Sequence, residues 1–334
     1  MMNNLKGTCL ITGGTGTYGT ACVNYLLENG IFDKIIIFSR DELKQSQLKY
    51  SLSKKYPNNN VRFLIGDVRD KERLQRAFTN VDYVIHAAAM KNIEYTEYNP
   101  QECIKTNING TMNVAEASID CGVKKVLFIS SDKASQPSLL YGASKMVAEK
   151  FIVQANSYSQ NTKFSVCRYG NVVGSRGSIL HILLENKDAD FVLTHKDMTR
   201  FFFSVKEAVK LSLFALENSW GGEVFIPAIK SYKISDLFKL IDPKKPYKIV
   251  GMRPDEKLHE RLITESEVLR IALNGDYYVI VPEMTFWGNA VKGFYENKMV
   301  QVHENMFISE TATKLTDLEM ALFIREEVEK MRDN

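Results

Sequence analysis

The chain has 334 residues, 45% of them hydrophobic, which is enough for a large folded core. Its 43 Lys and Arg against 40 Asp and Glu give a net charge of +3, too small to predict a nucleic-acid-binding surface. The five cysteines lack metal-ligand spacing, and no apolar run reaches the ~18 residues of a membrane span. We therefore expect no metal, no membrane and no nucleic-acid partner, and a cytoplasmic location.

Short β-branched runs alternate with amphipathic stretches through the first half of the chain. Strands are predicted at 8–14, 33–40, 61–68, 82–89, 124–131 and 163–174, with helices at 18–30, 41–56 and 71–81, a long helix that ends at Cys121, and a helix from Tyr141. This βαβ repetition predicts an α/β fold with a Rossmann-like, doubly wound parallel sheet.

After about Gly174 the elements become shorter and less regular. Helices are expected at 178–186, 204–218 and 315–331, and strands at 190–194 and 222–228. We divide the chain into a nucleotide-binding domain, 1–174, to which later segments return, and a smaller lobe with the C-terminal tail, 175–334. This lobe should cap the carboxyl ends of the strands.

A glycine-rich turn follows the first predicted strand. "ITGGTGTYG" spaces Gly13, Gly16 and Gly19 as G-x-x-G-x-x-G and opens the first helix. Glycines let the backbone approach a pyrophosphate, and the helix N-terminus offers free N–H groups. The segment, including Thr15, Thr17 and Tyr18, therefore predicts a dinucleotide site.

The end of the second strand bears on the choice between NAD and NADP. Ser39 and Arg40 stand where an NAD site usually has an acid, and Lys44 follows one turn later, which favours a 2′-phosphate and NADP. The alternative is that Arg40 is a surface charge and Asp41 binds the ribose. Asp67, after the third strand, is placed for the adenine amino group or for capping a helix.

A second constellation lies in "SSDKASQPSLLYGASK", residues 130–145. Tyr141 and Lys145 are one helical turn apart, and an ammonium beside a phenol lowers the pKa of the phenol toward the range of a base. Plain hydride chemistry accounts for these two and Ser131 but not for Asp132 and Lys133. An acid and an amine suit an elimination, which adds one proton while removing another.

The chain resembles the extended short-chain dehydrogenase/reductase superfamily over about residues 7–280. The segments that carry this resemblance are "TGGTGTYG", "HAAA" (86–89), "TNINGTMNV" (106–114) and "YGASK". Within the superfamily it resembles the UDP-N-acetylglucosamine 4,6-dehydratases, particularly the C5-inverting type. That match rests on the 130–145 segment and on "SRDELKQ", "GDVRDKERL", "HAAAMK", "EYNPQECIKTNINGT", "RYGNVVGSRGS", "MTRFF" and "GGEVFIP".

The resemblance implies a catalytic cycle. Tyr141 takes the O4 proton of the sugar while NADP accepts hydride from C4, Lys145 binds the nicotinamide ribose, and Ser131 bonds near O4. Lys133 removes the C5 proton of the 4-ketone, Asp132 protonates the leaving C6 hydroxyl, and hydride returns to C6. Delivery of a proton to the opposite face of C5 would give UDP-2-acetamido-2,6-dideoxy-β-L-arabino-hexos-4-ulose, the first step toward an unusual amino sugar for glycans.

The resemblance also implies the binding residues and an assembly. It places Lys91 near the pyranose, Asn171, Arg200 and Arg253 near the diphosphate, and Glu256 on the uridine ribose of UDP-N-acetylglucosamine, and it implies a homo-oligomer. Surface or interlobe ion pairs are the alternative for Arg200 and Arg253, and His86 is expected to be a packed strand residue. The cofactor set is Gly13, Thr15, Gly16, Thr17, Tyr18, Gly19, Ser39, Arg40, Lys44, Asp67, Val68, Ala87, Ala88, Ala89, Asn107, Tyr141 and Lys145, with Asn107 at a structural asparagine of the superfamily.

Two departures from the pattern keep alternatives open. This chain has "NIEYTEYNP" from Asn92 where the dehydratases have a His-Val-Pro-Val stretch, and Asp255 replaces a glycine. The first departure lies near the sugar and bears on the C5 stereochemistry. The competing hypotheses are a C5-retaining dehydratase, a sugar-nucleotide 4-epimerase and a non-catalytic NADP-sensing protein.

Overall fold

A computed structural model of the chain describes residues 5–175, 178–185 and 190–332. Arg176, Gly177 and Asn186, which belong to segments quoted above, lie outside the described residues. The strands are β1 Thr8–Thr12, β2 Lys34–Ser39, β3 Val61–Ile65, β4 Tyr83–His86, β5 Lys125–Ile129, β6 Lys163–Cys167, β7 Asn171–Val172, β8 Phe191–Leu193, β9 Thr199–Phe203, β10 Val224–Pro227, β11 Lys230–Lys233, β12 Tyr247–Ile249, β13 Ile271–Asn274 and β14 Tyr277–Ile280.

The helices are α1 Thr17–Glu28, α2 Glu42–Lys55, α3 Lys71–Phe78, α4 Ile93–Tyr98, α5 Pro100–Cys103, α6 Gly110–Asp120, α7 Leu140–Ala155, α8 Ile179–Glu185, α9 Val205–Asn218, α10 Ile234–Ile241, α11 Glu265–Val268, α12 Ala290–Tyr295 and α13 Asp317–Arg332. A π-helical turn, η1 Ile104–Asn109, joins α5 to α6, and the 3-10 turns are η2 Asp132–Ala134, η3 Glu296–Lys298 and η4 Glu304–Phe307.

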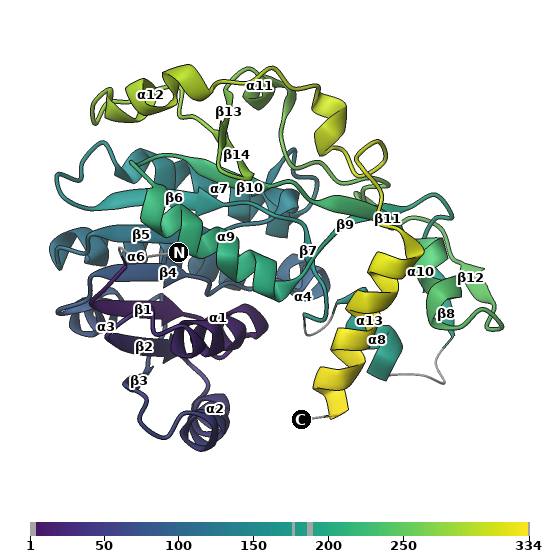
Figure 1. Ribbon diagram of the computed structural model, residues 1–334, viewed down its shortest axis with the longest axis horizontal. Coiled ribbons are helices and arrows are strands. Elements are labelled where there is room, and N and C mark those ends of the chain that lie inside the picture. Colours follow the sequence, from purple (N-terminus) through teal and green to yellow (C-terminus); the bar gives the residue numbers. More distant parts are fainter. Residues whose placement is uncertain (1–4, 176–177, 186–189, 333–334) are drawn as a thin grey trace.

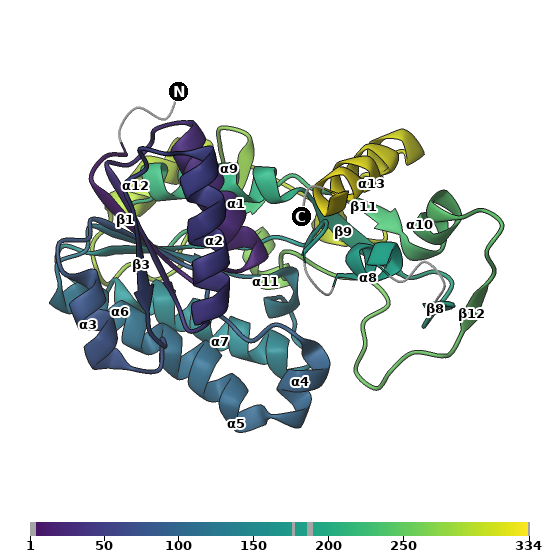
Figure 2. The same cartoon turned by 90° about the horizontal axis from the view of Figure 1, so that it is seen from below.

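One large sheet organises the molecule. Its strand order is β13-β14-β10-β6-β5-β4-β1-β2-β3; β1 to β6 and β10 are parallel, and β13 and β14 add an antiparallel edge. Figure 2 shows α1, α2 and α9 on one face and α3, α6 and α7 on the other. The predicted doubly wound fold is therefore confirmed. The order reverses between β1 and β4, and a crevice opens at such a switch point.

Aliphatic runs build this sheet because both of its faces are covered. In β2, Ile35, Ile36, Ile37 and Phe38 are each at most 3% exposed, so the strand is apolar on both sides rather than alternating. The core continues into α9, β10 and β14, which return to the large sheet after the chain has left it.

A second, smaller core lies beside the sheet. It begins at Val173 and includes Leu180, Phe191, Phe238 and Met320. Figures 1 and 2 show α8, α10, β8, β12 and α13 together on one side of the molecule, away from β3. The second core begins close to the predicted boundary at 174. The segment 251–264 runs from this lobe back to the large one. The candidate site lies between the two cores.

The helix expected up to Cys121 is interrupted. The chain forms α4, α5, the π-helical turn and α6 in succession, and π-helical turns are frequent at functional sites. Asn107, in the π turn, is 1% exposed; its amide donates to Met90 O at 2.9 Å and accepts from Met90 N at 2.8 Å. The turn therefore fixes the loop that follows β4.

Candidate active site

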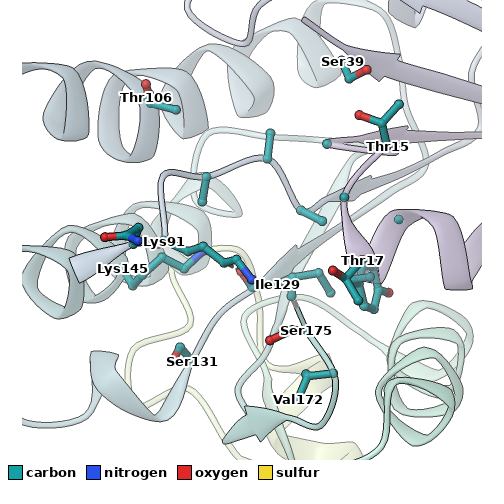
Figure 3. A pocket seen from close by; sticks show the side chains of 18 of the residues that line it. Thr15, Thr17, Ser39, Lys91, Thr106, Ile129, Ser131, Lys145, Val172 and Ser175 are labelled. Carbon is teal, nitrogen blue, oxygen red and sulfur yellow. Dashed lines mark hydrogen bonds between the residues drawn. The ribbon is translucent and has the colours of Figure 1, made fainter. Parts of the chain in front are cut away.

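A cavity of about 660 Å³ opens at the carboxyl ends of β1, β4 and β5. Its wall contains all the predicted cofactor residues except Asn107, together with Ser131, Lys133, Lys91 and Asn171. Figure 3 shows Thr15 and Thr17 on one side of it and Lys145, Lys91 and Ser131 on the other. The structure thus brings the glycine-rich turn and the 130–145 segment to one space.

The glycine-rich turn has the form of a phosphate cradle. Gly13 has φ of +68°, and a Cβ there would lie 2.8 Å from the backbone N of Ala88. A Cβ on Gly19 would lie 2.5 Å from Cα of Gly14. Helix α1 begins with no side-chain cap and no acid in its first turn, so its N–H groups are available to an anion. These residues fit a dinucleotide.

The end of β2 carries charges of both signs. Arg40, whose side chain is 57% exposed, lies 3.5 Å from Asp67 Oδ2, and both line the cavity. Asp41 caps α2 by accepting from Lys44 N at 2.9 Å, and its other oxygen is 3.1 Å from Lys44 Nζ. Asp70, not Asp67, caps α3. Asp41 therefore has a local structural role, and Asp67 lines the cavity with Arg40 while it accepts from Arg69.

Lys145 and Tyr141 occupy consecutive turns of α7. Lys145 is 3% exposed, its Nζ donates to Ile129 O at 2.6 Å, and burial lowers its pKa to about 7. Burial raises the pKa of Tyr141, and the ammonium that opposes this rise is that of Lys133. The effect of Lys145 on Tyr141 stays a prediction.

His86 is a packed strand residue, as expected. Its ring lies between the hydroxyls of Thr12 and Thr111, at 2.7 and 3.0 Å. Burial, together with the charge of Lys145, lowers its pKa to about 3. A neutral, fully buried imidazole with both nitrogens occupied has no free group for proton transfer.

Asp132 and Lys133 lie in η2, immediately after β5. Asp132 is 0% exposed; its Oδ1 accepts from Ser131 Oγ at 2.8 Å and from Lys133 Nζ at 3.1 Å, and its Oδ2 has no partner. Burial raises its pKa, which outweighs the opposing effect of Lys133. A carboxyl held in this way is suited to donate a proton.

Lys133 faces the cavity from the same turn. Its Nζ also donates to Asn171 Oδ1 at 3.0 Å and lies 3.6 Å from Glu260 Oε1. Burial lowers its pKa, but the carboxylates of Asp132 and Glu260 outweigh burial and raise it well above the ordinary value. Lys133 is therefore an ammonium at rest and must lose a proton before it can act as a base.

The structure does not bring every predicted substrate residue to this cavity. Arg200 donates to the carbonyl oxygens of Thr199, Leu258 and Lys257 at 2.8, 3.0 and 2.9 Å. Arg253 is exposed, and Glu256 accepts from its backbone N at 3.2 Å. Arg200 thus holds the 257–258 backbone, and the nucleotide contacts of these three residues stay predictions.

Asn107 is also placed differently from the other cofactor residues. Besides Met90, its amide donates to Ser144 Oγ at 2.9 Å, which joins the π turn to α7. It thereby positions α7 and the Met90 loop, in keeping with the structural asparagine that the resemblance indicated, and direct cofactor contact stays a prediction.

Glu260 is a site residue that the sequence reasoning missed. It is 4% exposed, and its Oε2 has no partner. The signal available was its place in "KLHERL", an acid within a mixed apolar segment, four residues after Glu256. Nothing in that spacing predicts a contact with Lys133, which is 127 positions earlier in the chain.

No group of three or more His, Cys, Asp or Glu among residues 5–175, 178–185 and 190–332 is arranged to hold a metal ion. Over the same ranges, no helix is both long and apolar enough to cross a membrane.

The glycine-rich turn, the Tyr141–Lys145 pair and the strand order define an extended short-chain dehydrogenase/reductase. A family model described as "Polysaccharide biosynthesis protein" matches residues 9–282, and the chain belongs to that family.

Individual relatives agree with this assignment. The chain is 48% identical over 280 residues to "UDP-N-acetylglucosamine 4,6-dehydratase (inverting)" of Campylobacter jejuni subsp. jejuni serotype O:23/36 (strain 81-176), covering 82% of this chain and 83% of that protein. It is 37% identical to "UDP-glucose 4-epimerase" of Rickettsia canadensis (strain McKiel), covering 82% of each. Among solved structures, Pen from Bacillus thuringiensis superposes with a TM-score of 0.86 at 32% identity, covering 96% of this chain and 97% of that one. The resemblance to the inverting dehydratases is thereby confirmed.

Proposed function

We propose that the protein is an NADP-dependent UDP-N-acetylglucosamine 4,6-dehydratase, a hydro-lyase that inverts C5. The observation that carries the proposal is the Asp132–Lys133 pair, joined at 3.1 Å on a cavity that also presents Tyr141 and Ser131. The 48% identity to an inverting dehydratase supports the substrate and the stereochemistry. A 4-epimerase has no evident use for Lys133 and releases no water.

The residues divide the work of an elimination between them. Tyr141 takes the proton of O4 with Ser131 beside it, and the ketone formed at C4 acidifies the C5 proton. A bound nicotinamide supplies reversible hydride transfer, removing hydride from C4 and returning it to C6. Lys145 and the glycine-rich turn would hold this cofactor.

The acid and the base can be produced together by one proton shift. Transfer of a proton from Lys133 to Asp132 along their hydrogen bond gives a neutral amine and a neutral carboxyl, and burial favours neutral forms. The amine then removes the C5 proton while the carboxyl protonates the leaving C6 hydroxyl, which departs as water. The pair ends as ammonium and carboxylate, as it began.

The choice of NADP over NAD is supported by Arg40 and Lys44 on the cavity wall and by the use of Asp41 as a helix cap. A guanidinium suits a 2′-phosphate, whereas a free carboxylate at this edge suits the ribose hydroxyl.

The assembly and the location belong to the same proposal. We expect a homo-oligomer, because the dehydratases that the chain resembles assemble as dimers or larger rings. We also expect a cytoplasmic location, with no nucleic-acid or membrane partner. Sedimentation equilibrium should give a multiple of the 38.0 kDa chain mass. A species of the chain mass alone would contradict the assembly.

The proposal is tested by incubating the protein with UDP-N-acetylglucosamine in D2O and following the C6 methyl signal by proton NMR. A methyl signal with deuterium at C5 supports dehydration. Inversion of configuration at C4 with no methyl signal would indicate an epimerase instead.

A further inference from the structure

The region opposite Asp132 holds a carboxylate to which the proposed cycle gives no part. Glu260 Oε1 lies 3.6 Å from Lys133 Nζ and 3.8 Å from Arg200 Nε. Its other oxygen is buried without a partner, and an unsatisfied buried carboxylate oxygen is costly. A carboxylate that is kept in such an unfavourable environment is a candidate for a functional residue.

The surrounding structure fixes Glu260 firmly. The backbone N of Glu260 donates to Ser309 Oγ at 2.8 Å, and its carbonyl accepts from Ser309 N at 2.8 Å. Arg200 donates to the carbonyl oxygens of Lys257 and Leu258, which precede Glu260 in the same loop. Lys257 Nζ in turn donates to Ser135 O at 2.8 Å, just beyond η2. The loop that carries Glu260 is therefore anchored to β9, to η2 and to the 309 segment.

We infer that Glu260 is a positioning residue for Lys133, whose amine it orients and whose positive charge it stabilises during proton abstraction. This inference rests on the proposed function. Asp132, the neighbouring residue in the chain, accepts a hydrogen bond from Lys133 Nζ. Asn171 accepts a second one, and the Glu260 carboxylate lies at ion-pair distance from the same nitrogen. Two hydrogen-bond acceptors and a carboxylate at ion-pair distance fix the direction of an amine on a flexible stem.

The charge balance of the base step explains why an anion is needed. After the proton shift to Asp132, Lys133 is a neutral amine that gains a positive charge as it takes the C5 proton. Relative to that neutral amine, a preorganised carboxylate stabilises the charge as it develops in the transition state. The groups that face Lys133 are Asp132, Tyr141, Glu260, Arg200 and Lys257, and both carboxylates raise its pKa.

The first experiment measures Lys133 directly, without turnover. The cofactor-loaded protein is labelled with ¹³C at lysine Cε, and the Lys133 signal is identified by its loss in Lys133→Met. Glu260→Gln should lower the pKa of Lys133 by about 1–3 units, because an anion within ion-pair distance is lost. Glu265→Gln, an exposed acid of the adjoining segment whose side chain is 72% exposed, is the matched control and should leave the titration unchanged. An unchanged titration in Glu260→Gln would overturn the inference.

The second experiment measures dehydration by the same variants. Glu260→Gln should lower kcat about 100-fold with KM nearly unchanged, because a misdirected amine no longer meets the C5 proton, and activity should be partly rescued in Glu260→Asp. An unchanged kcat would overturn the positioning role even if the titration moved. If Glu260→Gln does not fold, Glu260→Asp carries both measurements. If the unaltered protein forms no methyl product, the proposed function fails, while the Lys133 titration still decides whether Glu260 controls this lysine.

Discussion

At the scale of single residues, the chemistry depends on which groups carry protons before the sugar arrives. Asp132 is buried beneath the cavity wall with its pKa raised, and Lys133 reaches the cavity as an ammonium. The two must exchange a proton before they can act as acid and base. The proposed exchange rests on their 3.1 Å contact, which is not visible in the sequence.

Lys133→Met tests the base. The variant should keep its cofactor, because the phosphate cradle is formed by Gly13, Gly16 and the start of α1, and it should lose deuterium incorporation at C5 by at least about 100-fold. Cofactor retention is read from absorbance after desalting and exchange from proton NMR. Continued exchange at the original rate would remove Lys133 from the base role.

Arg40→Ala tests the ribose pocket. Loss of the guanidinium should weaken NADP by about 10-fold or more while leaving NAD nearly unchanged, since a charged hydrogen bond contributes about 1.5–3 kcal/mol. Isothermal titration with both cofactors measures this, and Lys54→Ala on the exposed part of α2 is the control. Equal weakening of both cofactors would mean that Arg40 does not face a 2′-phosphate.

At the scale of elements, a buried charge cluster fixes the helix that carries Tyr141. Arg168, at the end of β6, forms paired hydrogen bonds with Glu149 of α7 and with Glu267 of α11, and all three side chains are at most 10% exposed. Removing one partner of a buried pair leaves an uncompensated charge.

Arg168→Met should therefore lower the free energy of unfolding by about 3–5 kcal/mol. Arg325→Met, which breaks the exposed pair with Glu329, should change it by less than about 0.5 kcal/mol. Urea unfolding followed by circular dichroism measures both. A change in Arg168→Met no larger than that of the control would show that the cluster does not hold these elements together.

Glu267 predicts an acid-sensitive contribution to stability. Burial raises its pKa, but Arg168 outweighs burial and lowers it to about 2. The folded state therefore binds the proton less tightly than the unfolded chain, so the stabilisation is present above about pH 4.3 and is lost as pH falls toward 2. Over that interval it amounts to about 3 kcal/mol. Glu267→Gln should flatten the stability curve there, whereas parallel curves for both proteins would contradict this origin.

The sequence predicted the elements with local signals and missed those that depend on distant partners. The βαβ alternation, the glycine-rich turn and the Tyr141–Lys145 spacing were all readable because each is set by residues within one or two turns. The π-helical turn and the contact of Glu260 with Lys133 were not, because they arise only when the 104–109 and 251–264 segments meet the large sheet. The effect of Lys145 on Tyr141 stays a prediction, and the lowering effect of Lys133 on the pKa of Tyr141 was not predicted from the sequence.

At the scale of the whole molecule, the site is completed by both lobes. The large sheet supplies the dinucleotide cradle, Asp132, Lys133 and Tyr141, and the returning 251–264 segment supplies Glu260 and the predicted nucleotide residues Arg253 and Glu256. Asp255 in that segment has φ of +59°, a conformation that glycine adopts readily, and Ser138 Oγ donates to its carbonyl at 2.7 Å. The segment thus keeps the backbone form that the family's glycine indicates.

Dehydration of the sugar with inversion at C5 can be followed in a single experiment. Purified protein is incubated with UDP-N-acetylglucosamine in D2O, and a proton NMR time course follows the C6 methyl and the H4 and H5 signals. We expect a new methyl signal, deuterium at C5 and the couplings of the L-arabino product. D-xylo couplings would contradict inversion, and the absence of any methyl signal would contradict dehydration itself.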